Sequence, residues 1–306
     1  MLRRSVLAAV AALGLGLMSL SPASALEVTH AMGKTEVPDA PQRVVILTNE
    51  GTEALLALGI KPVGAVKSWL GDPWYKHIAG QMTDVTVVGE ESAINLEAIA
   101  ALQPDLIIGN KTRQEKIYDQ LSAIAPTVFA ERLRGDWRVN FALYAEALNK
   151  KAEGDALLAH FDGRVKALSE ALGDNKNQQI SLVRFMTGKT RIYYNDTFAG
   201  IILKEIGFKR PPVQDKPTFA DDVTKERIPE MDGDRLFYFT YEIGDGGAAK
   251  QADEWTKEAL WQNLPVVKAG KAEAVDDAVW NTAGGYIAAN LLLDDIARAY
   301  GVTLAQ

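Results

Sequence analysis

The sequence of 306 residues contains no cysteine. The chain can therefore form no disulfide bond, even in an oxidising compartment. The same absence excludes the lipid that lipoproteins carry on a cysteine at their signal-peptide cleavage site. If this protein is exported, we expect it to diffuse freely in its compartment, not to be tethered to a membrane as a lipoprotein.

Histidine is scarce, and its three copies are His30, His77 and His160. His30 lies near the N-terminus and His160 lies inside a helix-favouring stretch, so we do not expect these side chains to converge on one ion. We therefore predict no metal site. Beyond residue 25 the chain also lacks the GxSxG, HExxH and P-loop patterns of common enzymes, and we expect a protein that is not an enzyme.

Blocks of like charge are absent as well. Lysine and arginine number 33 against 40 aspartates and glutamates, which gives a formal net charge of −7 at pH 7. Nucleic acids and membrane surfaces are usually bound by a basic block or face, so we expect neither as a partner. An acidic chain can still contain a basic pocket.

The only long apolar run without a charge stands at the N-terminus. Arg3 and Arg4 precede it, it extends from Val6 to Leu20, and small residues follow up to Ala25. This order is typical of a secretory signal peptide. A membrane anchor is the alternative, but a spanning helix needs about 20 apolar residues. We predict a signal peptide at 1–25, export by the general secretion route, and a free protein that the outer membrane retains in the periplasm.

Beyond residue 25, short β-rich runs alternate with helical patterns, which predicts an α/β fold with parallel sheets covered by helices. In the first half the expected strands are 44–47, 106–108 and 127–129, and the expected helices are 52–58 and 113–124. In the second half the expected strands are 180–183, 191–194 and 236–239, and the expected helices are 198–206 and 285–300.

The middle of the chain, from 138 to 172, favours helix throughout and contains no proline. The simplest layout is two α/β lobes joined by a long bridging helix, with a ligand cleft between the lobes. We place the N-terminal lobe at 26–148, the bridging helix at 149–174 and the C-terminal lobe at 175–306.

The segment 95–109, NLEAIAALQPDLIIG, resembles the signature of class III periplasmic substrate-binding proteins of ABC importers. Segments 111–128, 183–203, 224–242 and 275–296 resemble the iron(III)-siderophore branch, closest to binders of citrate-based and mixed hydroxamate–carboxylate siderophores. The resemblance implies a monomer that binds a ferric siderophore and delivers it to an inner-membrane ABC transporter permease. The siderophore would hold the iron, and the protein would need no cofactor and no metal ligand of its own.

Basic and aromatic residues at strand ends and in loops are the candidate ligand contacts. Arginine meets carboxylates in pairs of hydrogen bonds and stays charged, and aromatic faces suit apolar linkers. Each arginine or lysine can also be a solvated surface group, and each aromatic residue can be plain packing. The candidates are Trp69, Lys111, Arg113, Trp137, Arg138, Arg184, Met186, Arg191, Tyr193, Tyr241 and Trp280, with Arg134 and Lys189 as further possibilities.

The resemblance also implies two contacts with the permease. In related binders one glutamate on each lobe meets arginines of the permease, and the matching positions here are Glu97 and Glu226. Alternatively, each glutamate only stabilises the start of a helix.

Other ligands and one other class of function stay open. Haem or cobalamin binding is compatible with the same fold. A periplasmic siderophore hydrolase would need a nucleophile beside a base, and no such arrangement is evident. The residues 90–93 stand where some hydroxamate-binding relatives have an arginine, which argues against a simple trihydroxamate.

Overall fold

The computed structural model describes residues 25–305. The predicted signal peptide therefore lies outside the described residues, apart from Ala25. That residue begins strand β1 (Ala25–His30), which forms an antiparallel hairpin with β2 (Gly33–Pro38). In the described part of the chain, no helix combines the length and the apolar character that crossing a membrane requires.

The N-terminal lobe is built on a five-stranded parallel sheet in the order β5-β4-β3-β8-β9. The three predicted strands are present as β3, β8 and β9. The predicted helix at 113–124 is broken in the structure into α3, a 3₁₀ turn at 115–117 and α4. The elements of this lobe are β3 (Val44–Ile46), α1 (Asn49–Ala57), β4 (Gly64–Ala65), β5 (Thr86–Val87), β6 (Gly89–Glu90), β7 (Ala93–Ile94), α2 (Leu96–Ala101), β8 (Leu106–Asn110), α3 (Lys111–Gln114), α4 (Tyr118–Ser122) and β9 (Thr127–Ala130).

The C-terminal lobe contains a mixed sheet in the order β12-β11-β10-β13-β14, where a parallel one was expected. The tight turn at Thr187-Gly188, with Gly188 at φ 68°, joins β10 to β11 as a hairpin, and such a short connection forces antiparallel pairing. The elements are β10 (Ile180–Met186), β11 (Lys189–Tyr193), α7 (Phe198–Ile206), β12 (Ala220–Val223), β13 (Arg235–Thr240), α8 (Gly247–Thr256), α9 (Ala259–Gln262), α10 (Pro265–Lys268), β14 (Ala272–Val275) and α11 (Tyr286–Tyr300).

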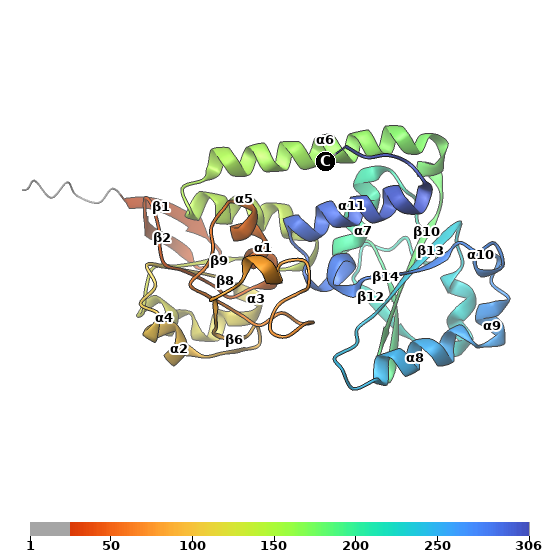
Figure 1. The fold of residues 1–306 in the computed structure, drawn as a ribbon, viewed down its shortest axis with the longest axis horizontal. Coiled ribbons are helices and arrows are strands. Elements are labelled where there is room, and N and C mark those ends of the chain that lie inside the picture. The colour runs from red at the N-terminus through yellow and green to blue at the C-terminus, as the bar shows by residue number, and fades with distance from the viewer. Residues whose placement is uncertain (1–24, 306) are drawn as a thin grey trace, which may run out of the picture.

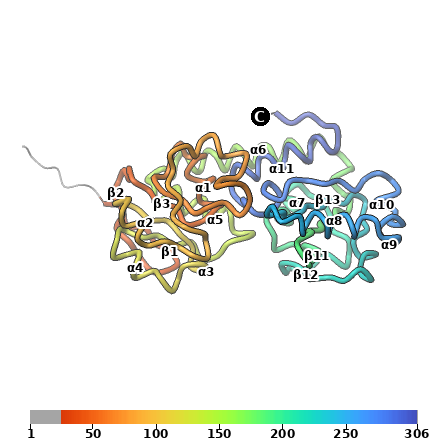
Figure 2. The backbone as a smooth tube through the Cα atoms, turned by 60° about the horizontal axis from the view of Figure 1, so that its bottom comes forward, coloured from red at the N-terminus to blue at the C-terminus, as the bar shows by residue number. Residues whose placement is uncertain are grey.

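The helix-favouring middle of the chain forms two helices, α5 (Trp137–Ala147) and α6 (Lys151–Leu172). The break lies at Asn149, whose φ of 52° is left-handed and interrupts the helical hydrogen bonds. Helix α6 runs along both lobes, and α11 lies beside it (Figure 1). The two lobes are therefore joined on one side by helices, and the tube view shows them side by side (Figure 2).

One apolar core continues through this helical side. It contains Ile46 of the first sheet, Phe141 and Phe161 of the connecting helices, Phe237 of the second sheet and Leu292 of α11, all buried. Because one core serves both lobes there, their relative motion is restricted at the helices and is freest at the opposite edge.

Candidate functional site

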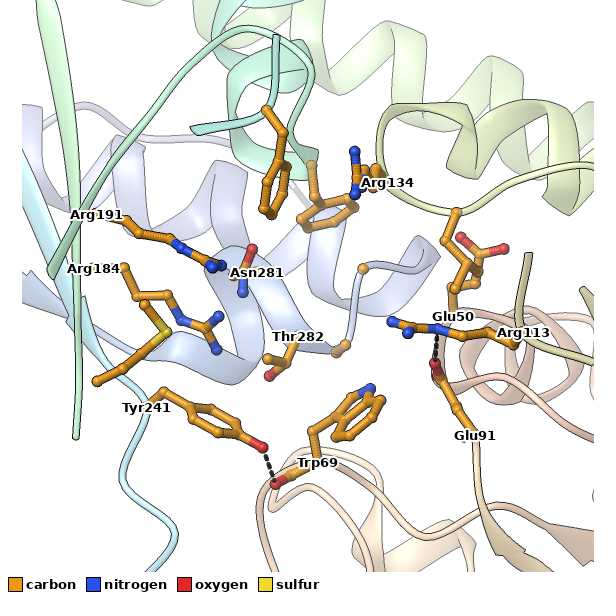
Figure 3. A pocket seen from close by; sticks show the side chains of 16 residues that line it. Glu50, Trp69, Glu91, Arg113, Arg134, Arg184, Arg191, Tyr241, Asn281 and Thr282 are labelled. Carbon is orange, nitrogen blue, oxygen red and sulfur yellow. Dashed lines mark hydrogen bonds and ion pairs between the residues drawn. The ribbon is translucent and has the colours of Figure 1, made fainter. Parts of the chain in front are cut away.

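A cavity of about 390 Å³ lies between the lobes. Both lobes contribute to its wall, and four arginines and two glutamates project around it (Figure 3). Its lining comprises Glu50, Trp69, Glu91, Arg113, Leu133, Arg134, Arg184, Met186, Arg191, Phe198, Phe219, Tyr241, Asn281, Thr282, Ala283 and Gly284.

The register of the strands in the second sheet places three charged residues in a row at the C-terminal wall of the cavity. Arg184 on β10 lies opposite Arg191 on β11, and Arg191 lies opposite Asp222 on β12. Directly opposite residues share one face of a sheet, so the two arginines stand side by side. Two adjacent like charges repel each other, and each guanidinium has an aspartate partner that reduces this repulsion.

Arg184 is held by a buried two-bond ion pair with Asp277. Its Nε donates to Oδ2 at 2.6 Å, its Nη2 donates to Oδ1 at 2.9 Å, and its Nη1 donates to the hydroxyl of Tyr193 at 3.1 Å. Arg184 is only 7% exposed and Asp277 only 3%. Burial raises the pKa of Asp277, and Arg184 opposes that rise. The guanidinium is therefore fixed in place by contacts within the protein.

Tyr241 connects the two lobes at the cavity. The Arg184 guanidinium lies 4.6 Å from the centre of its ring, and its hydroxyl donates to the carbonyl oxygen of Trp69 at 3.4 Å. Trp69 belongs to the N-terminal lobe, and the two residues lie next to each other in the close view (Figure 3). This hydrogen bond is a weak contact between the lobes that lobe movement can break. Arg132 and Asp196 add an ion pair between the lobes, with Nη1 3.4 Å from Oδ2.

Arg134 is the cavity arginine with no acidic side chain within 4.0 Å among the described residues. Its guanidinium lies 4.3 Å from the ring centre of Phe219, which comes from the other lobe, and Arg191 lies 5.9 Å from the same ring. Arg134 is exposed and has a φ of 79°. Since no carboxylate neutralises it, Arg134 is the cation most available to an anionic ligand.

The N-terminal wall carries a buried carboxyl group, Glu91, which is 4% exposed. Its Oε1 accepts hydrogen bonds from the backbone N–H and the side-chain amide of Asn49, at 2.7 and 2.8 Å. Its Oε2 lies 3.6 Å from Nε of Arg113. Burial raises the pKa of Glu91, while the Asn49 hydrogen bonds and Arg113 oppose the rise. The charge of Arg113 is thus partly neutralised by Glu91, and the arginine side chain is still 41% exposed.

A second buried carboxyl group, Glu50, lies in the first turn of α1. Its Oε1 accepts from the amide of Asn140 at 2.6 Å and from the hydroxyl of Tyr144 at 3.0 Å. Burial raises the pKa of Glu50 to about 8, although these hydrogen bonds oppose the rise. At neutral pH this carboxyl group is therefore protonated.

The segment 281–284 supplies the floor of the cavity. It comprises the end of a π-helical turn (Ala278–Thr282) and the two residues that follow it, before α11. Gly284 has a φ of 66°, a conformation that other residues rarely adopt. Asn281 and Thr282 do not cap α11; the N–H of Ala288 in its first turn is bound instead by Oε2 of the buried Glu53, at 2.8 Å. The hydroxyl of Thr282 donates weakly to the carbonyl oxygen of Asp277, at 3.5 Å, and the side-chain amide of Asn281 is left for the cavity.

Six of the predicted ligand contacts line this cavity: Trp69, Arg113, Arg184, Met186, Arg191 and Tyr241. Arg134, considered as a further possibility, lines it as well. Tyr193 is buried behind the lining, where its hydroxyl holds Arg184.

The remaining predicted contacts lie away from the lining. Trp137 is 1% exposed and packs against Phe161, and Trp280 is 1% exposed and donates from Nε1 to Asp295 at 2.9 Å. The other three candidates are basic residues, and each forms ion pairs with acidic side chains outside the cavity. Arg138 pairs with Asp162 and Glu205, Lys111 with Glu131, and Lys189 with Asp222.

Sequence reasoning missed the two buried glutamates, the apolar residues Leu133, Phe198 and Phe219, and the 281–284 floor. Glu50 looks like an ordinary acidic residue in a first helical turn, and only its burial distinguishes it. The proximity of Asn281 and Thr282 to the predicted contact Trp280 was the one available signal for the floor.

Glu97 and Glu226 lie outside the cavity and are exposed. Glu97 is in the first turn of α2, whose N-cap is Asn95, and Glu226 is in the first turn of a 3₁₀ helix (Lys225–Met231). They belong to different lobes. A hydrogen bond from Thr224 lowers the pKa of Glu226, so this side chain is ionised at neutral pH.

The chemistry of the cavity suits a ligand with several negatively charged oxygens. Four guanidinium groups bring positive charge to the wall, and Arg134 offers a planar pair of N–H donors that no acidic side chain among residues 25–305 occupies. The rings of Trp69, Phe219 and Tyr241 offer apolar faces. Among residues 25–305 there is no group of three or more His, Cys, Asp or Glu side chains that could hold a metal ion.

Comparison with protein families matches residues 44–277 to the model of the periplasmic binding proteins. Among individual proteins, the chain is 58% identical over 279 residues to YfiY of Bacillus subtilis, described as a probable siderophore-binding lipoprotein, with 88% of this chain and 86% of that protein covered. It is 31% identical to the achromobactin-binding periplasmic protein of Dickeya dadantii, with 86% and 87% covered.

Among solved structures, Staphylococcus aureus SirA complexed with staphyloferrin B superimposes with a TM-score of 0.83 at 36% identity. The match covers 91% of this chain and 99% of that one. The two-lobed arrangement with a long connecting helix is therefore one that this chain shares with a siderophore-binding protein.

Proposed function

Because the chain belongs to the periplasmic binding protein family, we propose that it captures a ferric siderophore between its lobes and delivers it to an ABC transporter permease for iron uptake. The observation that carries the proposal is the cavity between the lobes, with its four arginines and four aromatic residues. The names of the relatives support it, since YfiY, the Dickeya protein and SirA are all described with siderophores.

In this proposal the siderophore holds the iron and the protein holds the siderophore. The guanidinium groups bind peripheral carboxylates, and the rings of Trp69, Phe219 and Tyr241 cover apolar linkers. A citrate-based or mixed hydroxamate–carboxylate siderophore meets this pattern. Arg134, with no acidic side chain within 4.0 Å among residues 25–305, can pair with a carboxylate in two hydrogen bonds, and the other three arginines add positive charge beside their acidic partners. A function without catalysis would leave the ligand chemically intact.

Closure around the ligand would be a small hinge movement. The shared core beneath α6 and α11 resists a large rotation. Away from that core, the Tyr241–Trp69 hydrogen bond and the Arg132–Asp196 ion pair are long contacts that can rearrange. Trp69 and Tyr241 would then close over the bound complex from opposite lobes.

Delivery would use the exposed glutamates Glu97 and Glu226, one on each lobe, as docking contacts for basic residues of an inner-membrane permease. We propose that the protein acts as a monomer in the periplasm after removal of residues 1–25. YfiY is described as a lipoprotein, whereas this sequence has no cysteine that could carry the lipid.

The test is a fluorescence titration of the protein against ferric citrate, ferric staphyloferrin B, a schizokinen-like complex, a catecholate, a trihydroxamate, haem and cobalamin. We expect the citrate-type or mixed carboxylate complexes to bind most tightly, and each ferric complex to bind more tightly than its iron-free form, because chelation preorganises the ligand. Tighter binding of haem or cobalamin than of every ferric siderophore would refute the proposal. Mass spectrometry of the recovered ligand would reveal any hydrolysis.

A further inference from the structure

We propose that Glu50 contacts the bound siderophore as a neutral carboxylic acid, donating a hydrogen bond from Oε2 to a ligand oxygen and so coupling binding to proton occupancy. The inference rests on the proposed function, because the ligand must bring oxygen acceptors into this cavity. It gives the N-terminal wall a hydrogen-bond donor that is lost when Glu50 loses its proton. An arginine stays protonated and cannot make binding depend on pH in this way.

The hydrogen bonds of Glu50 are divided unequally between its two oxygens. Asn140 and Tyr144 both donate to Oε1, and no described residue forms a hydrogen bond with Oε2. The residue is 7% exposed and lines the cavity, on the side of Arg113 in the close view (Figure 3). Oε2 is therefore the carboxyl oxygen that remains for a ligand.

The charge environment favours the proton. Glu50 has no lysine, arginine or histidine nitrogen within 4.0 Å among the described residues, whereas Glu91 has Arg113 at 3.6 Å. A buried carboxylate without a cation is strongly unfavourable and normally becomes protonated. Glu91 and Asp136 add repulsion to the burial that raises the pKa of Glu50 to about 8.

Groups on several elements lie around this carboxyl group or the cavity beside it, and among them Tyr144, Glu91 and Asp136 act on its pKa. Apart from Asn140, which does not titrate, the surrounding groups are Tyr144 on α5, Asp136 before α5, Glu91 after β6, Arg113 on α3, Arg134 before α5 and Glu53 one turn further along α1.

The protonation state decides whether Glu50 attracts or repels the ligand. The neutral acid donates an O–H to an anionic oxygen, a strong class of hydrogen bond, whereas the carboxylate would face that oxygen as a like charge. The affinity should therefore be constant below about pH 8 and fall by about tenfold per pH unit above it, because one proton must be regained for each ligand bound.

The experiment compares wild type with Glu50→Gln by fluorescence titration with ferric citrate and ferric staphyloferrin B, from about pH 6.5 to about pH 9.5. The amide keeps an N–H donor and does not titrate. We expect the variant to bind a few-fold more weakly at neutral pH and to lose the decline above about pH 8. Glu153→Gln, on the exposed surface of α6, is the matched control and should follow the wild-type profile. Parallel profiles of wild type and Glu50→Gln would overturn the inference while leaving the proposed function intact.

A measurement without ligand separates the two proposals further. An infrared difference spectrum of wild type minus Glu50→Gln at neutral pH should contain the C=O stretch of a protonated carboxyl group, and this band should disappear above about pH 8. A carboxylate band in its place would refute the inference. Failure of every ferric siderophore to bind wild type at about pH 6.5 would instead refute the proposed function and, with it, any contact of Glu50 with such a ligand.

Discussion

Arg184 and Asp277 meet through two hydrogen bonds, Nε to Oδ2 at 2.6 Å and Nη2 to Oδ1 at 2.9 Å, and both residues are nearly buried. The pair joins strand β10 to the segment that leads into α11. It keeps a guanidinium at the cavity wall in one orientation, so a ligand meets a donor that is already in position.

Breaking this pair from one side should destabilise the protein more than removing it entirely. Arg184→Met or Asp277→Leu leaves a buried charge without its partner, and each should lower the free energy of unfolding by about 3–5 kcal/mol. The double variant should be less destabilised than either single one. Urea unfolding measures all three. Lys189→Ala, which breaks an exposed pair with Asp222, is the control and should change stability by less than about 1 kcal/mol. Additive effects in the double variant would contradict this account.

The arginines at the cavity should contribute more to ligand affinity than an arginine outside it. Arg134→Ala and Arg191→Ala should each weaken binding of the preferred ferric siderophore by roughly 10- to 100-fold, as expected for lost hydrogen bonds to charged groups. Arg138→Ala should leave affinity unchanged, because its guanidinium faces Asp162 and Glu205. Fluorescence titration checks this order. Equal losses of affinity in all three variants would mean that the net charge of the protein, and not contacts in the cavity, determines ligand affinity.

The exposed glutamates should matter for delivery and not for capture. The double variant Glu97→Ala, Glu226→Ala should keep the wild-type ligand affinity and lose most iron uptake in a strain that lacks the native protein. The double variant Glu153→Ala, Glu170→Ala removes two exposed glutamates from α6 and is the matched control. Full uptake by the first variant would exclude the docking role, and lost ligand affinity would place these residues in the binding function.

The proton on Glu50 should also be visible in the stability of the protein. The pKa of Glu50 rises from an ordinary 4.5 to about 8 in the folded chain. Between these two pH values the folded state holds a proton that the unfolded state has released, so the stability falls as pH rises through this range. Glu50→Gln removes that loss and should be more stable than wild type at about pH 8, by up to a few kcal/mol, with no such gain near pH 4.5. Urea unfolding at several pH values measures the difference, and a constant difference would refute it.

Several elements could be predicted because their signals are local. Helix α7 was expected at 198–206, and the structure places it at Phe198–Ile206, ended by Gly207 at φ 108°. Strands β3, β8 and β9 follow from short runs of buried, mostly apolar residues. A left-handed glycine or a run of β-branched residues acts on its immediate neighbours, so short stretches of sequence determined these elements.

The position of α5, the mixed second sheet and most of the cavity depended on tertiary structure. Arg134 and Arg138 are four residues apart and chemically alike, yet the first faces the cavity and the second faces Asp162 and Glu205. Glu50 and Glu97 both stand in first helical turns, yet only the packing of Asn140 and Tyr144 over Glu50 buries it. The sequence alone determined the residue types and the local elements. Burial and partners were decided by contacts between residues about 90 positions apart, and those contacts exist only after the chain has folded.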